Sequence, residues 1–325
     1  MKDSLKKVLK YLLSSSLAIV LLWFSFREVE WADFARELAQ CRWGFIILSM
    51  AAGAFAFWLR GVRWRQLLLP IDPSISRMTT FNGINIGNIS NFVFPRIGEF
   101  IRCGVITRRS SATYDRVLGT VVLERGWELL VMLLMLFVVV VGGFERFGGF
   151  FVEQIWTPLS QRLEGDIWWF LGALSVAGTA AIYALWRFRT TNAFCSKVWG
   201  VFRGILQGFS SCLRMERKWL FFAYTAFIWM VYWLMAACTV WAAPFLDHLT
   251  VIDALFLSLV GGIGFAVPVP GGIGAFHFVI SLALAGVYDV PMETGIIYAT
   301  LSHTSQAITQ IIFGLISYAY EAIKK

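Results

Sequence analysis

Six runs of apolar residues, each close to the length that a membrane-spanning helix needs, make up much of this chain. A helix crosses the hydrocarbon core of a bilayer with about 20 mostly apolar residues. The runs cover residues 10–26, 43–60, 117–141, 167–186, 219–241 and 294–319. Two further apolar stretches, 81–106 and 254–288, are interrupted by proline and glycine. The pattern predicts an all-α polytopic membrane protein with six full transmembrane helices and two broken, re-entrant hairpins, in a single integral membrane domain over residues 1–325.

Composition supports a membrane protein and argues against a soluble enzyme. Of the 325 residues, 58% are hydrophobic and 15% are charged, and the mean hydropathy is +0.69. Soluble domains carry about 45–50% apolar and about 25% charged residues. The net charge is +8, but in a membrane protein basic residues first report topology, so no nucleic acid partner is expected. The 5 cysteines and 3 histidines are scattered without metal-ligand spacing, so neither a metal site nor another cofactor is expected.

The distribution of basic residues predicts which side of the membrane each loop faces. If each broken stretch enters and leaves on one side, one face of the membrane holds 22 Lys and Arg residues and the other holds 5. This imbalance satisfies the positive-inside rule, so both termini are predicted to be cytoplasmic, in a bacterial inner membrane. The count excludes a single crossing by either broken stretch. A pair of full crossings would give the same sidedness as a re-entrant hairpin.

The two broken stretches share a short pattern. Pro95-Arg-Ile-Gly-Glu-Phe100 aligns with Pro270-Gly-Gly-Ile-Gly-Ala-Phe276 after one insertion. By the predicted topology the stretches enter from opposite sides, and such paired interruptions point to the binding site of an inverted-repeat transporter. Chance similarity is the alternative, since proline and glycine are common in membrane loops. The hairpin tips are expected to meet near the middle of the membrane, and they consist of Pro95, Gly98, Pro270, Gly271, Gly272 and Gly274.

Charged residues inside the apolar stretches are the strongest candidates for binding a lipid head group. The candidates are Arg96, Glu99, Arg102, Glu124, Arg125 and Glu128. The first three follow a proline at helical spacing, so a helix over 97–106 would place them on one face, where they could pair. The other three lie within about one turn of the third run. Charges at such depth usually face a bundle interior. The alternative is that the second trio lies at the cytoplasmic interface with its charged ends in water.

Uncharged polar residues form weaker stripes that could line the same path. Asparagine recurs every three residues from 82 to 91, and a histidine and two glutamines share one face of the last run. The predicted secondary lining consists of Asn85, Asn88, Asn91, His277, His303, Gln306 and Gln310. Hydrogen bonding between neighbouring helices is the alternative, and it is the favoured interpretation of the asparagines.

These motifs, in this order and spacing, resemble the lysylphosphatidylglycerol synthase transmembrane family, also called flippase-like domain proteins, over nearly the whole chain. The matching features are Pro-Arg-Ile-Gly-Glu at 95–99, Glu-Arg at 124–125 and Pro-Gly-Gly-Ile-Gly at 270–274. The resemblance implies that the motif positions of the family fall on Arg96, Gly98, Glu99, Glu124, Arg125, Pro270, Gly271 and Gly272. In that family the domain is associated with moving aminoacylated phosphatidylglycerol across the bacterial inner membrane.

Two departures from the family pattern bear on the substrate. Members that synthesise lysylphosphatidylglycerol carry a soluble transferase domain after the membrane region, whereas this chain runs to Lys325, so that synthesis is not expected. Many relatives also carry glutamate a few residues after the late glycines, where this chain has Ala-Phe-His at 275–277. If that carboxylate recognises a cationic head group, a lysylated lipid is disfavoured as the substrate.

The expected function is that of a lipid flippase or lipid-phosphate transporter, which moves an anionic lipid or polyprenyl-phosphate head group by alternating access. Membrane lipid is the expected substrate, and a separate lipid-modifying enzyme is a candidate partner. The sequence has no Walker A motif and no complete catalytic motif, so the chain is not expected to be an enzyme. Two alternatives remain open. One is a polyprenyl-linked glycosyltransferase, in which Glu28 and Glu30 would hold a divalent metal; the other is a non-transporting partner of a lipid-modifying enzyme.

Overall fold

The computed structural model is built from helices throughout the part of the chain that it describes, so the expected all-α class is confirmed there. The described residues are 16, 19–23, 26, 30–162, 167–192, 195, 196, 199 and 217–324. The chain divides into two compact units, one formed by residues 1–121 with 217–325 and the other by residues 122–216. Each unit is described by itself.

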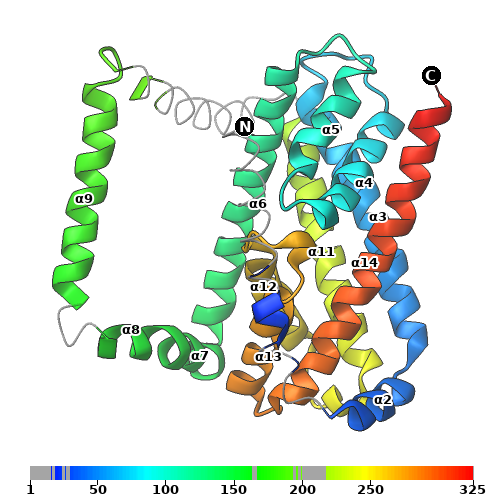
Figure 1. Ribbon diagram of the computed structural model, residues 1–325, viewed down its shortest axis with the longest axis vertical. Helices are drawn as coiled ribbons and strands as arrows, with labels where there is room; N and C mark the ends of the chain where they lie inside the picture. Colours follow the sequence, from blue (N-terminus) through cyan, green and yellow to red (C-terminus); the bar gives the residue numbers. More distant parts are fainter. Residues whose placement is uncertain are drawn as a thin grey trace. The chain divides into compact units, whose positions relative to one another are not determined.

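The first unit holds most of the long helices (Figure 1). Its helices are α2 (Trp31–Gln40), α3 (Trp43–Leu68), α4 (Arg77–Val93), α5 (Gly98–Thr107), α11 (Lys218–Ala242), α12 (Val251–Ala266), α13 (Ala275–Tyr288) and α14 (Met292–Ile323). Two short helical turns, η3 (Pro244–Leu246) and η4 (Pro270–Gly272), lie between them. Helix α11 packs along α3, α5 packs against α4, and α14 packs against α3, α4 and α13. The interface between α3 and α11 is apolar, with Ala56, Leu59, Ile228 and Val231 buried together.

The second unit begins within α6 (Tyr114–Gly142). It continues through η1 (Phe144–Gly148), α7 (Gly149–Phe151), η2 (Val152–Trp156), α8 (Thr157–Arg162) and α9 (Ile167–Arg187). Large apolar side chains on α6 are exposed over several turns, among them Leu129, Leu133, Leu134, Phe137 and Val138. A soluble protein rarely leaves so continuous an apolar surface exposed, whereas lipid covers it in a membrane.

Four described helical segments are long and apolar enough to cross a membrane, and three of them match expected spans. Residues 43–60, 117–141 and 219–241 were expected, and the structure has Trp43–Leu68, Tyr114–Gly142 and Lys218–Ala242. The fourth segment, Pro270–Tyr288, is the second arm of the later broken stretch. The expected spans at 167–186 and 294–319 are helical as α9 and α14, although neither is among the four. The run at 10–26 lies mostly outside the described residues. Six full spans therefore stay a prediction.

A single carboxylate, that of Asp72, ties the loop after α3 to the loop after α5. One of its oxygens accepts hydrogen bonds from the Ser74 amide at 2.9 Å and hydroxyl at 2.6 Å. The other accepts from the Ser111 amide at 2.8 Å and hydroxyl at 2.9 Å. These donors favour the charged form, so the bonds from Ser74 and then Ser111 lower the pKa of Asp72 below its ordinary value.

Replacing Asp72 by asparagine should lower the thermal unfolding midpoint at neutral pH and weaken its dependence on acid. Because the folded-state pKa is depressed, this stabilisation is complete above the ordinary pKa of about 3.9 and is lost as pH falls through the folded value. The difference between Asp72→Asn and the original chain in detergent should therefore shrink below about pH 4. Asp289→Asn is the control, since Asp289 is exposed and its left-handed backbone suits asparagine equally. Equal midpoints for Asp72→Asn and the original chain would contradict the role of Asp72.

Candidate functional site

The first break lies between α4 and α5, at Pro95 and Arg96. Pro95 has no amide hydrogen to continue the helix, and Arg96 adopts a left-handed backbone with φ of 61°. Helix α5 then begins at Gly98, whose amide donates to Oδ1 of Asn91 at 2.8 Å. Asn91, which was predicted to line a path, therefore caps the helix that follows the break.

The second break lies between α12 and α13 and is richer in left-handed backbone. Gly271, Gly272 and Gly274 have φ of 59°, 77° and 82°, values that glycine adopts without steric cost. In both breaks the residue after the last proline, Arg96 or Gly271, is left-handed with nearly the same φ. The alignment predicted from sequence thus has a counterpart in backbone conformation.

The two breaks contact each other within the first unit, at Gly271 and at residues near the other expected tips. Nη2 of Arg96 donates to the carbonyl oxygen of Ala266, the last residue of α12, at 2.6 Å and across 170 residues of sequence. The Phe92 ring lies against Gly271, so close that a Cβ added there would be 2.5 Å from the ring. Since α5 and α13 both begin at these breaks, the contact brings together two helix N-termini, three prolines and one exposed guanidinium.

Arg96 is not on the same helix face as Glu99 and Arg102, so that part of the expectation is wrong. Its left-handed backbone puts it before α5, whereas the other two lie inside the helix. Glu99 and Arg102 do form the predicted pair, with Arg102 Nη2 to Glu99 Oε2 at 3.0 Å. The Arg102 guanidinium also lies over the Trp64 ring, 4.7 Å from its centroid, and the side chain is only 2% exposed. This arrangement holds Arg102 in one place between α3 and α5.

Two of the predicted polar residues, His303 and His277, gather at the second break. Nε2 of His303 on α14 donates a hydrogen bond to the carbonyl oxygen of Gly271, at 2.9 Å. Its ring centroid lies 4.9 Å from that of His277 and 5.8 Å from that of Phe265, onto which it stacks. Because the carbonyl can only accept, His303 carries its hydrogen on Nε2 in this arrangement.

The remaining polar candidates lie between helices. Gln306 donates to the Ser49 hydroxyl on α3 at 3.4 Å, which fits the alternative of helix-to-helix bonding, and Gln310 is half-buried. Asn85 on α4 is fully buried, and neither atom of its amide has a hydrogen-bond partner. The Nδ2 atom of Asn88 is also buried without a partner. The asparagine stripe is therefore only partly satisfied.

In the second unit, Arg125 pairs with both of its acidic neighbours on α6. Arg125 Nη1 lies 2.8 Å from Glu128 Oε2, and Nη2 lies 3.4 Å from Glu124 Oε1. The Glu124 side chain is fully buried, whereas that of Arg125 is 38% exposed. This trio therefore pairs locally, and the Arg125 side chain stays partly exposed.

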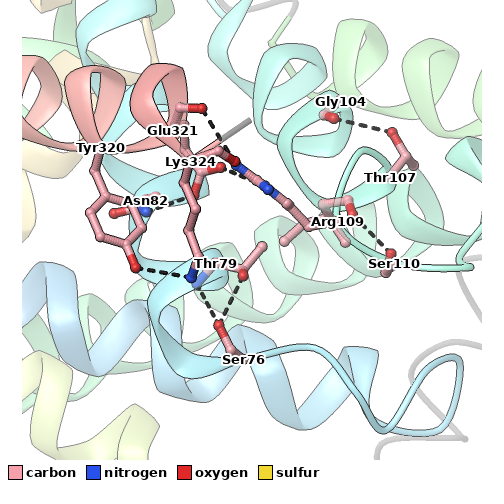
Figure 2. Close-up of polar contacts among 11 residues, drawn as sticks. Ser76, Thr79, Asn82, Gly104, Thr107, Arg109, Ser110, Tyr320, Glu321 and Lys324 are labelled. Carbon is pink, nitrogen blue, oxygen red and sulfur yellow. Dashed lines mark hydrogen bonds and ion pairs between the residues drawn. The ribbon is translucent and has the colours of Figure 1, made fainter.

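Sequence reasoning missed a cluster where the end of α14 meets α4 and the loop after α5 (Figure 2). Glu321 accepts from Asn82 Nδ2 at 2.7 Å and from Arg109 Nε at 3.0 Å. Arg109 also donates to the backbone carbonyls of Glu321 and Lys324. The sequence does show Glu321 beside the basic C-terminal residues, but the residues that Glu321 contacts, Asn82 and Arg109, are more than two hundred positions away. This cluster fixes the last helix rather than lining the breaks.

Arg63 on α3 is a second residue that the sequence did not single out. It is fully buried, and its guanidinium lies 5.8 Å from the centroid of the Phe221 ring. The run of arginines at 60–65 looked like an ordinary basic loop. The length of α3, which extends to Leu68, is what places Arg63 inside the helix.

Among the described residues no group of three or more His, Cys, Asp or Glu could hold a metal ion.

The apolar helices, the exposed apolar surface and the buried charges define a multi-pass membrane protein. The chain belongs to the lysylphosphatidylglycerol synthase transmembrane family, because the family model described as the lysylphosphatidylglycerol synthase TM region matches residues 8–314. This family is a membrane domain associated with lipid flipping or lysylphosphatidylglycerol synthesis. No curated protein and no solved structure matches the chain.

Proposed function

We propose that this chain is a lipid flippase or lipid-phosphate transporter, which moves an anionic lipid or polyprenyl-phosphate head group across the membrane by alternating access. In this proposal it binds and moves lipid without catalysing a reaction. A separate lipid-modifying enzyme would supply or consume the lipid. Membership of a family associated with lipid flipping or synthesis supports this class of substrate.

The observation that carries the proposal is the contact between the two breaks through Arg96 and Ala266. Interrupted helices in lipid leave backbone groups unpaired, which is costly unless protein or a watery cavity receives them. Broken helices in the two halves of a transporter commonly form its binding site, with helix N-termini directed at anionic groups. A guanidinium has five hydrogen-bond donors, so the bond from Arg96 to Ala266 leaves donors for a phosphate.

Two features of sequence and backbone support opposed, re-entrant hairpins as the moving parts. If each broken stretch enters and leaves on one side, the basic residues divide 22 to 5 between the two faces, which favours cytoplasmic termini in a bacterial inner membrane. With that orientation the breaks enter from opposite sides, as inverted repeats would. The shared left-handed residue after each last proline, Arg96 and Gly271, supports a common origin for the two hairpins.

Translocation of a labelled lipid in vesicles containing the purified chain tests this function. We expect head-group movement of fluorescent phosphatidylglycerol, phosphatidic acid or a polyprenyl phosphate above the rate in protein-free vesicles. Arg96→Ala should slow it by about tenfold or more, because a charge-assisted bond is lost, and Arg96→Lys should recover part of the rate. Arg77→Ala is the control, since Arg77 is exposed at the start of α4. Movement of none of these lipids would reject the proposal.

A further inference from the structure

The two helices that begin at the breaks differ at their N-termini. Helix α5 has a carboxylate in its first turn, Glu99, and its first amide is bonded by the Asn91 side chain. Helix α13 has no acidic residue in its first turn and no side-chain cap on its N-cap residue, Gly274. The first four amides of a helix have no partner inside it. In α13 these are the amides of residues 274–277, and neither the glycine at the N-cap nor an acidic side chain in the first turn serves them.

The first turn of α13 is also withdrawn from solvent. Gly274, Ala275, Phe276 and His277 are all buried. Helix α12 lies so close that a Cβ on Gly264 would be 2.9 Å from the Cα of Phe276. Buried amides without partners are rare in proteins and costly. A helix N-terminus in apolar surroundings is a ready site for an anion, because its amides and its dipole both favour negative charge.

His277 is the independent observation that points to a ligand there. The residue is only 5% exposed, and its Nδ1 atom is buried without a hydrogen-bond partner. Side chains tilt toward the N-terminus of a helix, so a ring on the third residue of α13 leans over the first turn. The ring lies 4.9 Å from His303, which itself bonds Gly271 in the turn before the helix. The unpartnered nitrogen therefore belongs to a side chain of the first turn of α13, and the neighbouring His303 links this side chain to the turn before the helix.

We propose that the first turn of α13 and the Nδ1 atom of His277 together form a phosphate-binding site. Amides of the first turn would donate to phosphate oxygens, and Nδ1 would donate one further bond in the neutral tautomer that carries its hydrogen on that atom. The aromatic surroundings, Phe265, Phe276 and His303, lower the local dielectric and strengthen each such bond. The inference rests on the proposed function, because it names the place where the phosphate of the moving head group is held.

Binding of short-chain phosphatidic acid to the full chain, in maltoside micelles that contain no phosphate, tests the site without requiring transport. We expect His277→Phe, which keeps the aromatic packing and removes the donor, to weaken binding by about tenfold or more. His277→Gln, which keeps a donor, should weaken it less. His248→Phe is the matched control, since His248 is exposed in the loop after η3. Inorganic phosphate is the second probe. If it displaces phosphatidic acid at a concentration similar to that of the lipid, free phosphate is the ligand. If it does not displace phosphatidic acid, the ligand is a lipid.

The nitrogen resonances of ¹⁵N-labelled histidine give a direct measurement on the original chain, in which His277 is intact, and variants serve only to assign the resonances. Phosphatidic acid should shift the Nδ1 resonance of His277, identified by elimination with His248→Phe and His303→Phe. An unmoved resonance, or binding to His277→Phe as tight as to the original chain, would overturn the site. Binding that depends on His277 in a chain that moves no lipid would reject the proposed function and keep the site. Lipid transport by a chain whose phosphatidic acid binding is unchanged by His277→Phe would reject the site and keep the proposed function.

Discussion

Gly98→Ala should destabilise the chain by about 3 kcal/mol, because there is no room for a methyl group where α5 meets α4. A Cβ on Gly98 would lie 2.0 Å from the carbonyl oxygen of Gly87 and 2.8 Å from Oδ1 of Asn91. The first of these atoms is backbone, so relief requires the two helices to separate. Separation would also break the bond from the Gly98 amide to Asn91. We expect a markedly lower unfolding midpoint in detergent and a smaller yield of monodisperse protein.

Gly104→Ala in the same helix is the matched control for Gly98→Ala. A Cβ on Gly104 meets no atom within 4 Å. Alanine there should be neutral or stabilising by up to about 1 kcal/mol, because alanine has the higher helix propensity. The two variants add the same methyl group to the same ten-residue helix, so the difference between their midpoints isolates the contact with Gly87. Equal midpoints would show that α4 and α5 do not approach each other in this way.

Local signals in the sequence predicted where the long helices break. Proline lacks the amide that a helix interior needs, and glycine adopts left-handed backbone, so both act at their own position whatever the tertiary structure. The breaks at Pro95 and at 268–274 could therefore be located, and so could their mutual contact once the two patterns were seen to match. The pairs Glu99–Arg102 and Arg125–Glu128 were predictable for the same reason, since residues three apart on a helix are neighbours.

The sequence could not predict partners that only the tertiary structure brings together. Arg96 was expected on a helix face, but its left-handed backbone turns it toward Ala266 on a distant helix. Glu321 and Arg109 are 212 positions apart, and no periodicity connects them. The close packing that demands glycine at position 98 was equally hidden, since its neighbour Gly87 belongs to another helix. In each case the deciding interaction is between elements whose arrangement the pattern leaves open.

Arg125→Ala should abolish lipid translocation if this guanidinium binds the phosphate of the head group. The guanidinium pairs with Glu128 and Glu124, which hold it in position, and the side chain as a whole is partly exposed. Arg125→Lys should restore transport only in part, because an ammonium group lacks the planar fork that binds two phosphate oxygens. Arg116→Ala is the control, since Arg116 is exposed on the same helix. The measurement is the initial rate of head-group movement in vesicles with equal amounts of folded protein.

Removing Arg125 also takes a cation away from the buried carboxylate of Glu124, and this structural effect must be separated from the loss of a binding group. A buried carboxylate is costly without compensating charge, so Arg125→Ala alone could lower stability. The double variant Arg125→Ala with Glu124→Gln removes both charges and should recover the unfolding midpoint without recovering transport. Recovery of transport in that double variant would show that Arg125 serves only to neutralise Glu124. Glu128→Gln completes the set: if Glu128 carries a coupled proton, transport in this variant should no longer depend on pH.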